Sequence, residues 1–174
     1  MGAGHRDAGS DRGTAGGVPQ ASEAVNWSAR LTELGLVLPP VPSPAGVYVP
    51  AVRCGSLVFT AGQLPLVDGA VAATGKLGVE IDTARGRELA RICVLNALAA
   101  VDDLVGLDAV TRVVKMVGFV ASASGFTAQP AVLNGASELL GDIFGQAGAH
   151  ARSAVGVAEL PMGAPVELEL IVKI

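Results

Sequence analysis

The 174 residues are enough for one domain with a hydrophobic core and too few for two domains of ordinary size. With a net charge of −4, the chain lacks the basic balance of a protein that binds nucleic acid over a broad surface. Hydrophobic residues make up 51% of the chain and charged residues 16%, and the excess is mostly Ala, Val, Leu and Gly. We expect part of this apolar surface to be buried between subunits.

The first 45 residues differ in composition from the rest. Residues 1–22 are rich in Gly, Asp, Arg and Ser and have little to bury, so we expect a disordered tail. The N-terminus lacks an apolar signal-peptide segment. Residues 23–45 are expected to form a short helix and then a proline-rich, extended connector over 38–44.

The short helix is predicted over residues 26–35. Asn26 or Ser28 would be its N-cap and Gly35 would end it. Trp27 is most simply an anchor that docks this helix on the domain; stacking on a ligand is the weaker alternative.

Residues 46–174 form the main domain, for which periodicity predicts the order β-β-α-β-α-β-β. Strands are expected over 47–52, 56–61, 110–122, 151–158 and 166–172, and helices over 82–104 and 129–144. This order favours an α+β fold, a mixed sheet with two helices on one face. The most apolar helical run, 89–101, is too short to span a bilayer, so we expect no membrane association.

The last two predicted strands carry most of the candidate chemistry. Residues 151–158 and 166–172 both alternate, and the proline- and glycine-rich segment between them suggests that they pair as a hairpin. If their apolar faces are buried together, Arg152, Glu167 and Glu169 share the other surface, where the remaining side chains are small. That surface would have room for a small charged ligand.

Cysteine and histidine are scarce. Cys54 and Cys93 suggest no disulfide framework, so we expect a reduced, cytoplasmic protein in which both are buried structural thiols. His5 and His150 cannot build a metal site alone, and we expect neither a metal nor a cofactor.

Two separated blocks carry a family resemblance. Tyr48 precedes the block 55–65 (GSLVFTAGQLP), and the block 152–161 (RSAVGVAELP) is followed by 166–169 (VELE). These resemble the N- and C-terminal signatures of the Rid family (reactive intermediate deaminase, RidA/YjgF-like, endoribonuclease L-PSP). The resemblance runs from about Tyr48 to the C-terminus. It implies a chorismate-mutase-like fold and a homotrimer with ligand clefts between subunits.

The resemblance also implies an activity, the hydrolysis of 2-imino or enamine acids to 2-keto acids and ammonia. Arg152 matches the family arginine that binds the substrate carboxylate, a role suited to a planar, permanently charged guanidinium. A structural ion pair of Arg152 with Glu167 or Glu169 is the alternative. Glu167 matches the carboxylate that positions water and moves its proton, whereas a structural role is favoured for Glu169. Such hydrolysis requires neither a nucleophilic triad nor a metal.

Four further residues match substrate-binding positions of the family: Tyr48, Gly62, Asn134 and Ala154. Gly62 would let its backbone N–H approach the ligand, and Ala154 would contribute through its backbone. Tyr48 would line the cleft, with a buried, hydrogen-bonded tyrosine as the alternative. One residue departs from the pattern: Ala61 stands where the family commonly has serine, so a hydroxyl that could hold the substrate is missing.

Three functions follow from these observations. The first is an imine and enamine deaminase, and the second is a non-catalytic trimer that binds a small carboxylate metabolite. The third, an endoribonuclease, is disfavoured because neither a basic stripe nor stacking aromatic residues occur. We therefore expect a small 2-imino or 2-keto acid as the partner, and not nucleic acid.

Overall fold

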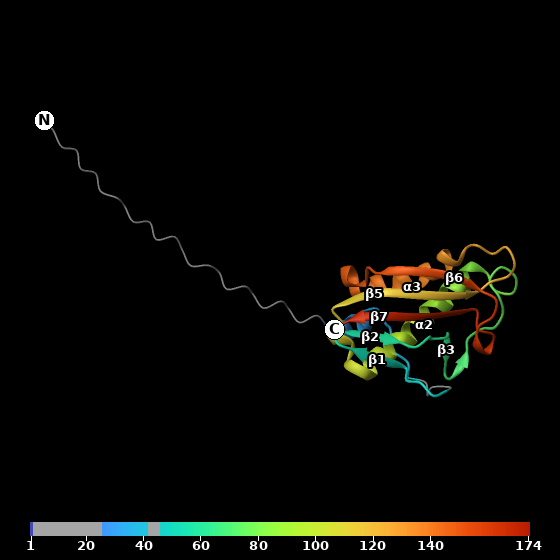
Figure 1. Cartoon of the computed structure of the whole chain (residues 1–174), viewed down its shortest axis with the longest axis horizontal. Helices are drawn as coiled ribbons and strands as arrows, with labels where there is room; N and C mark the ends of the chain where they lie inside the picture. The colour runs from blue at the N-terminus through green and yellow to red at the C-terminus, as the bar shows by residue number, and fades with distance from the viewer. Residues whose placement is uncertain (2–25, 42–45) are drawn as a thin grey trace.

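The computed structural model describes residues 1, 26–41 and 46–174. These residues form a five-stranded mixed sheet with the order β1-β2-β7-β5-β6, and a small separate hairpin, β3-β4. The predicted α+β fold, with both long helices on one face of the sheet, is confirmed (Figure 1). The strands are β1 (Ala51–Cys54), β2 (Leu57–Thr60), β3 (Leu66–Val67), β4 (Ala70–Val71), β5 (Arg112–Ala121), β6 (Ala151–Val157) and β7 (Val166–Lys173). The α-helices are α1 (Trp27–Glu33), α2 (Thr83–Val105) and α3 (Gln129–Phe144), and short 3-10 turns cover Leu107–Ala109, Gly145–Gly148 and Pro161–Gly163.

The two long helices begin and end close to where the sequence predicts. The Asp82 side chain caps α2 by accepting from the Arg85 N–H at 2.7 Å, and Gly106, with φ of 80°, ends the helix. Helix α2 covers β7, and α3 covers β5 and β6. The buried side chains of β7 alternate along the strand: Val166, Leu168, Leu170 and Val172. This alternation fixes the register of the central strand against the core.

The N-terminal helix α1 is anchored as predicted. Asn26 is its N-cap, because its side chain accepts from the Ala29 N–H at 2.7 Å. The Trp27 ring packs edge-on against Phe144, with centroids 5.0 Å apart, and its Nε1–H donates to the Val110 carbonyl at 2.8 Å. Residues 2–22 of the predicted tail and part of the connector lie outside the described residues.

The predicted C-terminal hairpin is wrong. β6 and β7 do not pair with each other, because β5 lies between them, parallel to β6 and antiparallel to β7. The β5–α3–β6 unit is a crossover that places β6 parallel beside β5. Residues 158–165 are longer than a hairpin turn, and they carry the chain past the end of β5 to its other side.

This topology changes which side chains share a face. Met116 of β5 is aligned with Arg152 and with Leu170, so Arg152 points to the side that the helices cover. Phe119, on the opposite face of β5, is aligned with Val155 and Glu167. The expectation that arginine and carboxylates share one surface of the chain is therefore wrong, because it assumed direct pairing of the two strands.

The uncovered face of the sheet is apolar but not lined only by small residues. It carries half-buried Phe59, Phe119 and Ile171, and exposed Val155. The apolar face expected to be buried along residues 151–158 includes Val155, which is exposed in the single chain because no helix packs on this side of the sheet. Cys54 is exposed at the end of β1, contrary to the prediction, whereas Cys93 is buried in α2 as expected.

Candidate functional site

Arg152 lies on β6, the edge strand of the sheet, and reaches toward α3. Its Nη1 donates to Asn134 Oδ1 at 2.9 Å and to Ser137 Oγ at 3.0 Å. The two α3 residues are three apart in sequence, so they share one face of the helix. The structure therefore brings together two predicted site residues, Arg152 and Asn134. Among the described residues Arg152 makes no ion pair with either glutamate of β7, which removes the structural alternative within the chain.

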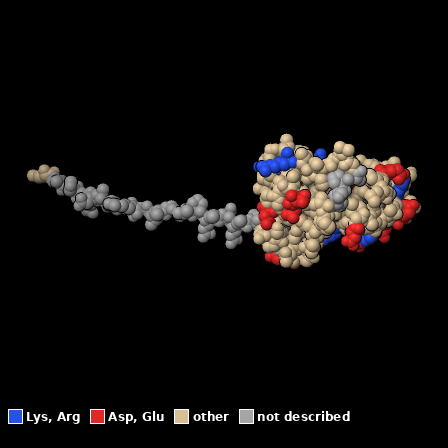
Figure 2. Space-filling view, turned by 90° about the horizontal axis from the view of Figure 1, so that it is seen from below, with Lys and Arg blue, Asp and Glu red and all other residues tan. Residues whose placement is uncertain are grey.

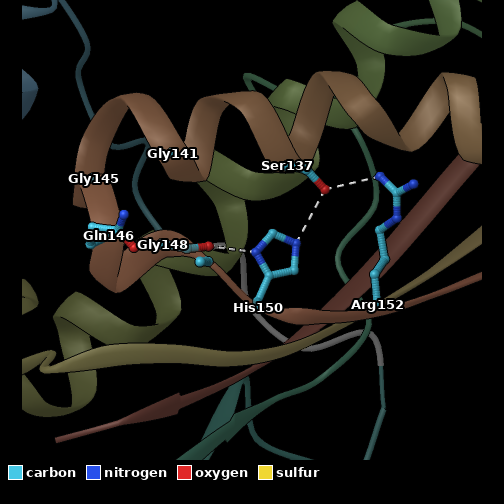
Figure 3. Close-up of a pocket in the computed structure, with 8 residues that line it drawn as sticks. Ser137, Gly141, Gly145, Gln146, Gly148, His150 and Arg152 are labelled. Atoms are coloured by element: carbon cyan, nitrogen blue, oxygen red, sulfur yellow. Dashed lines mark hydrogen bonds between the residues drawn. The ribbon is translucent and has the colours of Figure 1, made fainter.

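Ser137 and His150 extend this network, and sequence reasoning missed both. Ser137 Oγ lies 3.1 Å from His150 Nε2, and His150 Nδ1 lies 2.6 Å from the Gly148 carbonyl oxygen (Figure 3). The signal was available in the spacing: Ser137 follows Asn134 by one helical turn, and His150 precedes Arg152 by two residues, the repeat of a strand face.

A surface cavity of about 440 Å³ adjoins this network. Its polar side chains are those of Ser137, His150, Arg152 and Gln146, and the rest of its wall is largely glycine from the end of α3 and the following turn: Gly141, Gly145 and Gly148 (Figure 3). Two of the three N–H-bearing nitrogens of Arg152, Nε and Nη2, have no partner among the described residues, so they remain available to an anionic ligand.

Glu167 lies on the other face of the sheet, at a second surface cavity of about 640 Å³. Tyr48, Ala61 and Gly62 line the same cavity. A Cβ added at Gly62 would overlap the Glu167 carboxylate, so only glycine permits this close approach. Tyr48 is 53% exposed, which excludes the alternative of a buried tyrosine.

The Glu167 carboxyl is half-buried, and its environment favours the protonated form. Burial raises the pKa of Glu167 above its ordinary value, and the negative charge of Glu169, two residues along β7, raises it further. A carboxyl with a raised pKa holds a proton more readily than an ordinary carboxyl, which suits it to general acid–base catalysis.

Ala154 belongs to neither cavity lining. It lies on β6 opposite Gly118 of β5, on the side that the helices cover, and packs against the edge of the core. The structure thus divides the predicted site residues between the two faces of the sheet. Arg152 and Asn134 lie on one side, and Tyr48, Gly62 and Glu167 lie on the other.

The charged side chains show no concentration of one sign on the face in Figure 2. Basic and acidic residues lie there in small, separate groups on a largely uncharged surface. In the part of the chain that the structure describes, no cluster of three or more His, Cys, Asp or Glu side chains could hold a metal ion. No helix of the described residues is long and apolar enough to cross a membrane.

Comparison with known proteins decides the family. The model of the family named endoribonuclease L-PSP matches residues 40–174. The chain belongs to this family. Its members include the YjgF and RutC proteins, so the Rid resemblance of the two sequence blocks is confirmed.

Individual proteins also match most of the chain. Protein TCP17 of Trypanosoma cruzi is 43% identical over 84% of this chain and 93% of its own length. The crystal structure of Atu1372, a protein of unknown function from Agrobacterium tumefaciens, is 42% identical and covers 85% of this chain and 92% of its own, with a TM-score of 0.79. E. coli TdcF, solved with bound serine, is 29% identical and covers 77% of this chain and 93% of its own, with a TM-score of 0.55.

Proposed function

We propose that the protein hydrolyses 2-imino and enamine acids to 2-keto acids and ammonia, at sites formed between copies of the chain. Arg152 would bind the substrate carboxylate through its free Nε–H and Nη2–H donors, because a guanidinium binds a carboxylate bidentately. Asn134 and Ser137 would hold the guanidinium in place through Nη1. The observation that carries the proposal is this fixed, partly free arginine on the edge strand.

Glu167 would position the attacking water. Its raised pKa lets it take a proton from water as the imine carbon is attacked and return that proton to the departing nitrogen. Gly62 lies against this carboxylate and leaves space for the ligand beside it. The reaction needs orientation of substrate and water, not a nucleophile of the protein.

A second copy is required for both groups to reach one ligand, because Arg152 and Glu167 occupy opposite faces. The uncovered face of the sheet, with Phe59, Phe119 and Ile171, offers an apolar surface for such association. A homotrimer would bring the edge strand of one copy to the Glu167 cavity of the next, in a head-to-tail ring.

The test is release of ammonia from 2-iminopropionate generated in situ, with Arg152→Ala as the matched variant. Turnover that exceeds the uncatalysed rate and is lost in Arg152→Ala supports the proposal. The alternative is a non-catalytic binder of small carboxylate metabolites. The missing hydroxyl at Ala61 favours this alternative, and the bound serine of E. coli TdcF is a precedent for it. Binding of a 2-keto acid without any turnover would establish it.

A further inference from the structure

Ser137 and His150 form an arrangement that imine hydrolysis does not require. The Gly148 carbonyl can only accept a hydrogen bond, so the proton of a neutral His150 ring is on Nδ1, 2.6 Å from that oxygen. The lone pair on Nε2 then faces Ser137 Oγ at 3.1 Å and accepts from its hydroxyl. A hydroxyl, a base and a group that orients the base are thus linked in the order found in nucleophilic serine sites.

The hydrogen bonds of Ser137 leave one position free for attack. Its hydroxyl hydrogen goes to His150, and one lone pair accepts from Arg152 Nη1 at 3.0 Å. The second lone pair of Oγ has no partner among the residues that the structure describes. The adjacent guanidinium favours the negative charge that develops on oxygen as the proton leaves.

The same arginine gives the site a preference for anions. Asn134 Oδ1 and Ser137 Oγ use both N–H groups of Nη1, so Nε and Nη2 of Arg152 can pair with a carboxylate close to the nucleophile. The cavity of about 440 Å³ that opens beside them has Gly141, Gly145 and Gly148 in its wall, which leaves room for a small ligand.

We propose that this cavity supports a second reaction, which shares the free donors of Arg152 with the deaminase substrate and transfers the acyl group of small, carboxylate-bearing esters to Ser137 and then to water. Ser137 Oγ attacks the ester carbonyl carbon while His150 Nε2 takes the hydroxyl proton. The bond to the alcohol oxygen breaks, and His150 returns the proton to that oxygen. Water then attacks the acyl-serine with His150 again as the base, which releases the acid and restores the hydroxyl.

The experiment uses the full chain with two chromogenic esters, the mono-para-nitrophenyl ester of succinate and para-nitrophenyl acetate. We expect a burst of nitrophenol of up to one equivalent per chain and a succinyl adduct that peptide mass spectrometry maps to Ser137. Ser137→Ala removes burst and adduct, and His150→Gln slows acylation about 10²-fold. Arg152→Ala lowers the preference for the succinyl ester over the acetate about tenfold.

Ser124→Ala is the matched serine control, since Ser124 does not line the cavity. His5→Ala is the matched histidine control, since His5 is the one other histidine of the chain. Wild-type protein that acquires no adduct on Ser137, or acquires it on another residue, overturns the proposal. So does Ser137→Ala protein, folded by circular dichroism, that keeps the burst. The ester assay contains no imine, so a negative result does not bear on the proposed deamination. Conversely, if deamination is not observed, the adduct on Ser137 still decides whether acyl transfer occurs.

Discussion

Arg152 and Glu167 lie on opposite faces of one β-sheet. Both residues belong to strands that pair with β5, but Arg152 is aligned with Met116 and Glu167 with Phe119, which point to opposite sides. Under the proposed reaction, a ligand that touches both groups lies between two copies of the chain.

Removing the arginine should abolish deamination. Arg152→Ala loses the charge that binds the carboxylate, and hydrogen bonds to charged groups contribute about 1.5–3 kcal/mol each, so kcat/KM should fall by about 10²-fold or more. Arg152→Lys should recover little of it, because an ammonium cannot bind a carboxylate bidentately. Asn134→Ala leaves the guanidinium held by Ser137 alone, and we expect a loss of about tenfold.

Steady-state ammonia release measures these effects, with thermal melts to verify that each variant is folded. Equal activity of the wild-type protein and Arg152→Ala would show that the carboxylate is bound elsewhere.

Gly62→Ala should impair catalysis much more than folding. Gly62 does not need a left-handed φ, so alanine is compatible with the backbone, but its Cβ would displace the Glu167 carboxylate. A catalytic group moved by about 1 Å can cost about 10²-fold in rate. We expect kcat to fall by about this factor and the melting temperature to change little. A Gly62→Ala variant with unimpaired activity would contradict the placement of Glu167. By contrast, Ala61→Ser, in the same loop, adds a hydroxyl beside the cavity and should lower KM.

The acidic limb of the activity profile should depend on Glu169. Burial and the charge of Glu169 both raise the pKa of Glu167, so Glu169→Gln removes the second cause and should move the acidic limb of kcat/KM to lower pH. The shift is partial, because burial remains. A profile that does not move in Glu169→Gln would mean that another group sets the limb.

Stability should depend on the same carboxyl. Because its pKa is higher in the folded chain than in the unfolded chain, Glu167 contributes stability below its unfolded pKa, and this contribution is lost as pH rises through the folded pKa. Glu167→Gln should therefore gain stability relative to the wild-type protein as pH rises through that range. Urea unfolding at several pH values measures the difference in the free energy of unfolding. If Glu167→Gln instead lost stability relative to the wild-type protein as pH rises, the assigned direction of the pKa shift would be contradicted.

The docking of α1 should depend on Trp27. Trp27→Ala removes the packing on Phe144 and the hydrogen bond to the Val110 carbonyl. We expect the free energy of unfolding to fall by about 2 kcal/mol, less than the roughly 3–5 kcal/mol for a fully buried tryptophan, since Trp27 is partly exposed. Chemical unfolding followed by circular dichroism measures it, and an unchanged midpoint would show that α1 is not anchored.

Local sequence signals predicted both long helices and β5 well because their causes are local, whereas the first strand, predicted over 47–52, lies at Ala51–Cys54. The Asp82 cap and Gly106 set the ends of α2, and the β-branched run of β5 was recognised at its full length. Pairing between strands is not local. The alternation of β6 and β7 is the same whether they pair with each other or with β5, so the hairpin and the shared face of Arg152 and Glu167 did not follow from it.

The candidate site was predicted only in part, because it too depends on contacts between segments that are distant in the sequence. Gly62 was identified from the N-terminal family block and Asn134 from its match to a family position on the second helix, and the structure places each beside a predicted partner. Ser137 and His150 were matched to no family position, and only the fold brings the α3 face and the start of β6 together.

Complementation between two inactive variants tests the central claim most directly. Arg152→Ala keeps Glu167, and Glu167→Gln keeps Arg152, so mixed oligomers contain some interfaces at which both native residues meet. With random mixing of equal amounts in a cyclic oligomer, about a quarter of the interfaces are complete, and we predict about a quarter of wild-type deaminase activity. Mixed oligomers, verified by two affinity tags, that stay as inactive as either parent would contradict a site shared between copies.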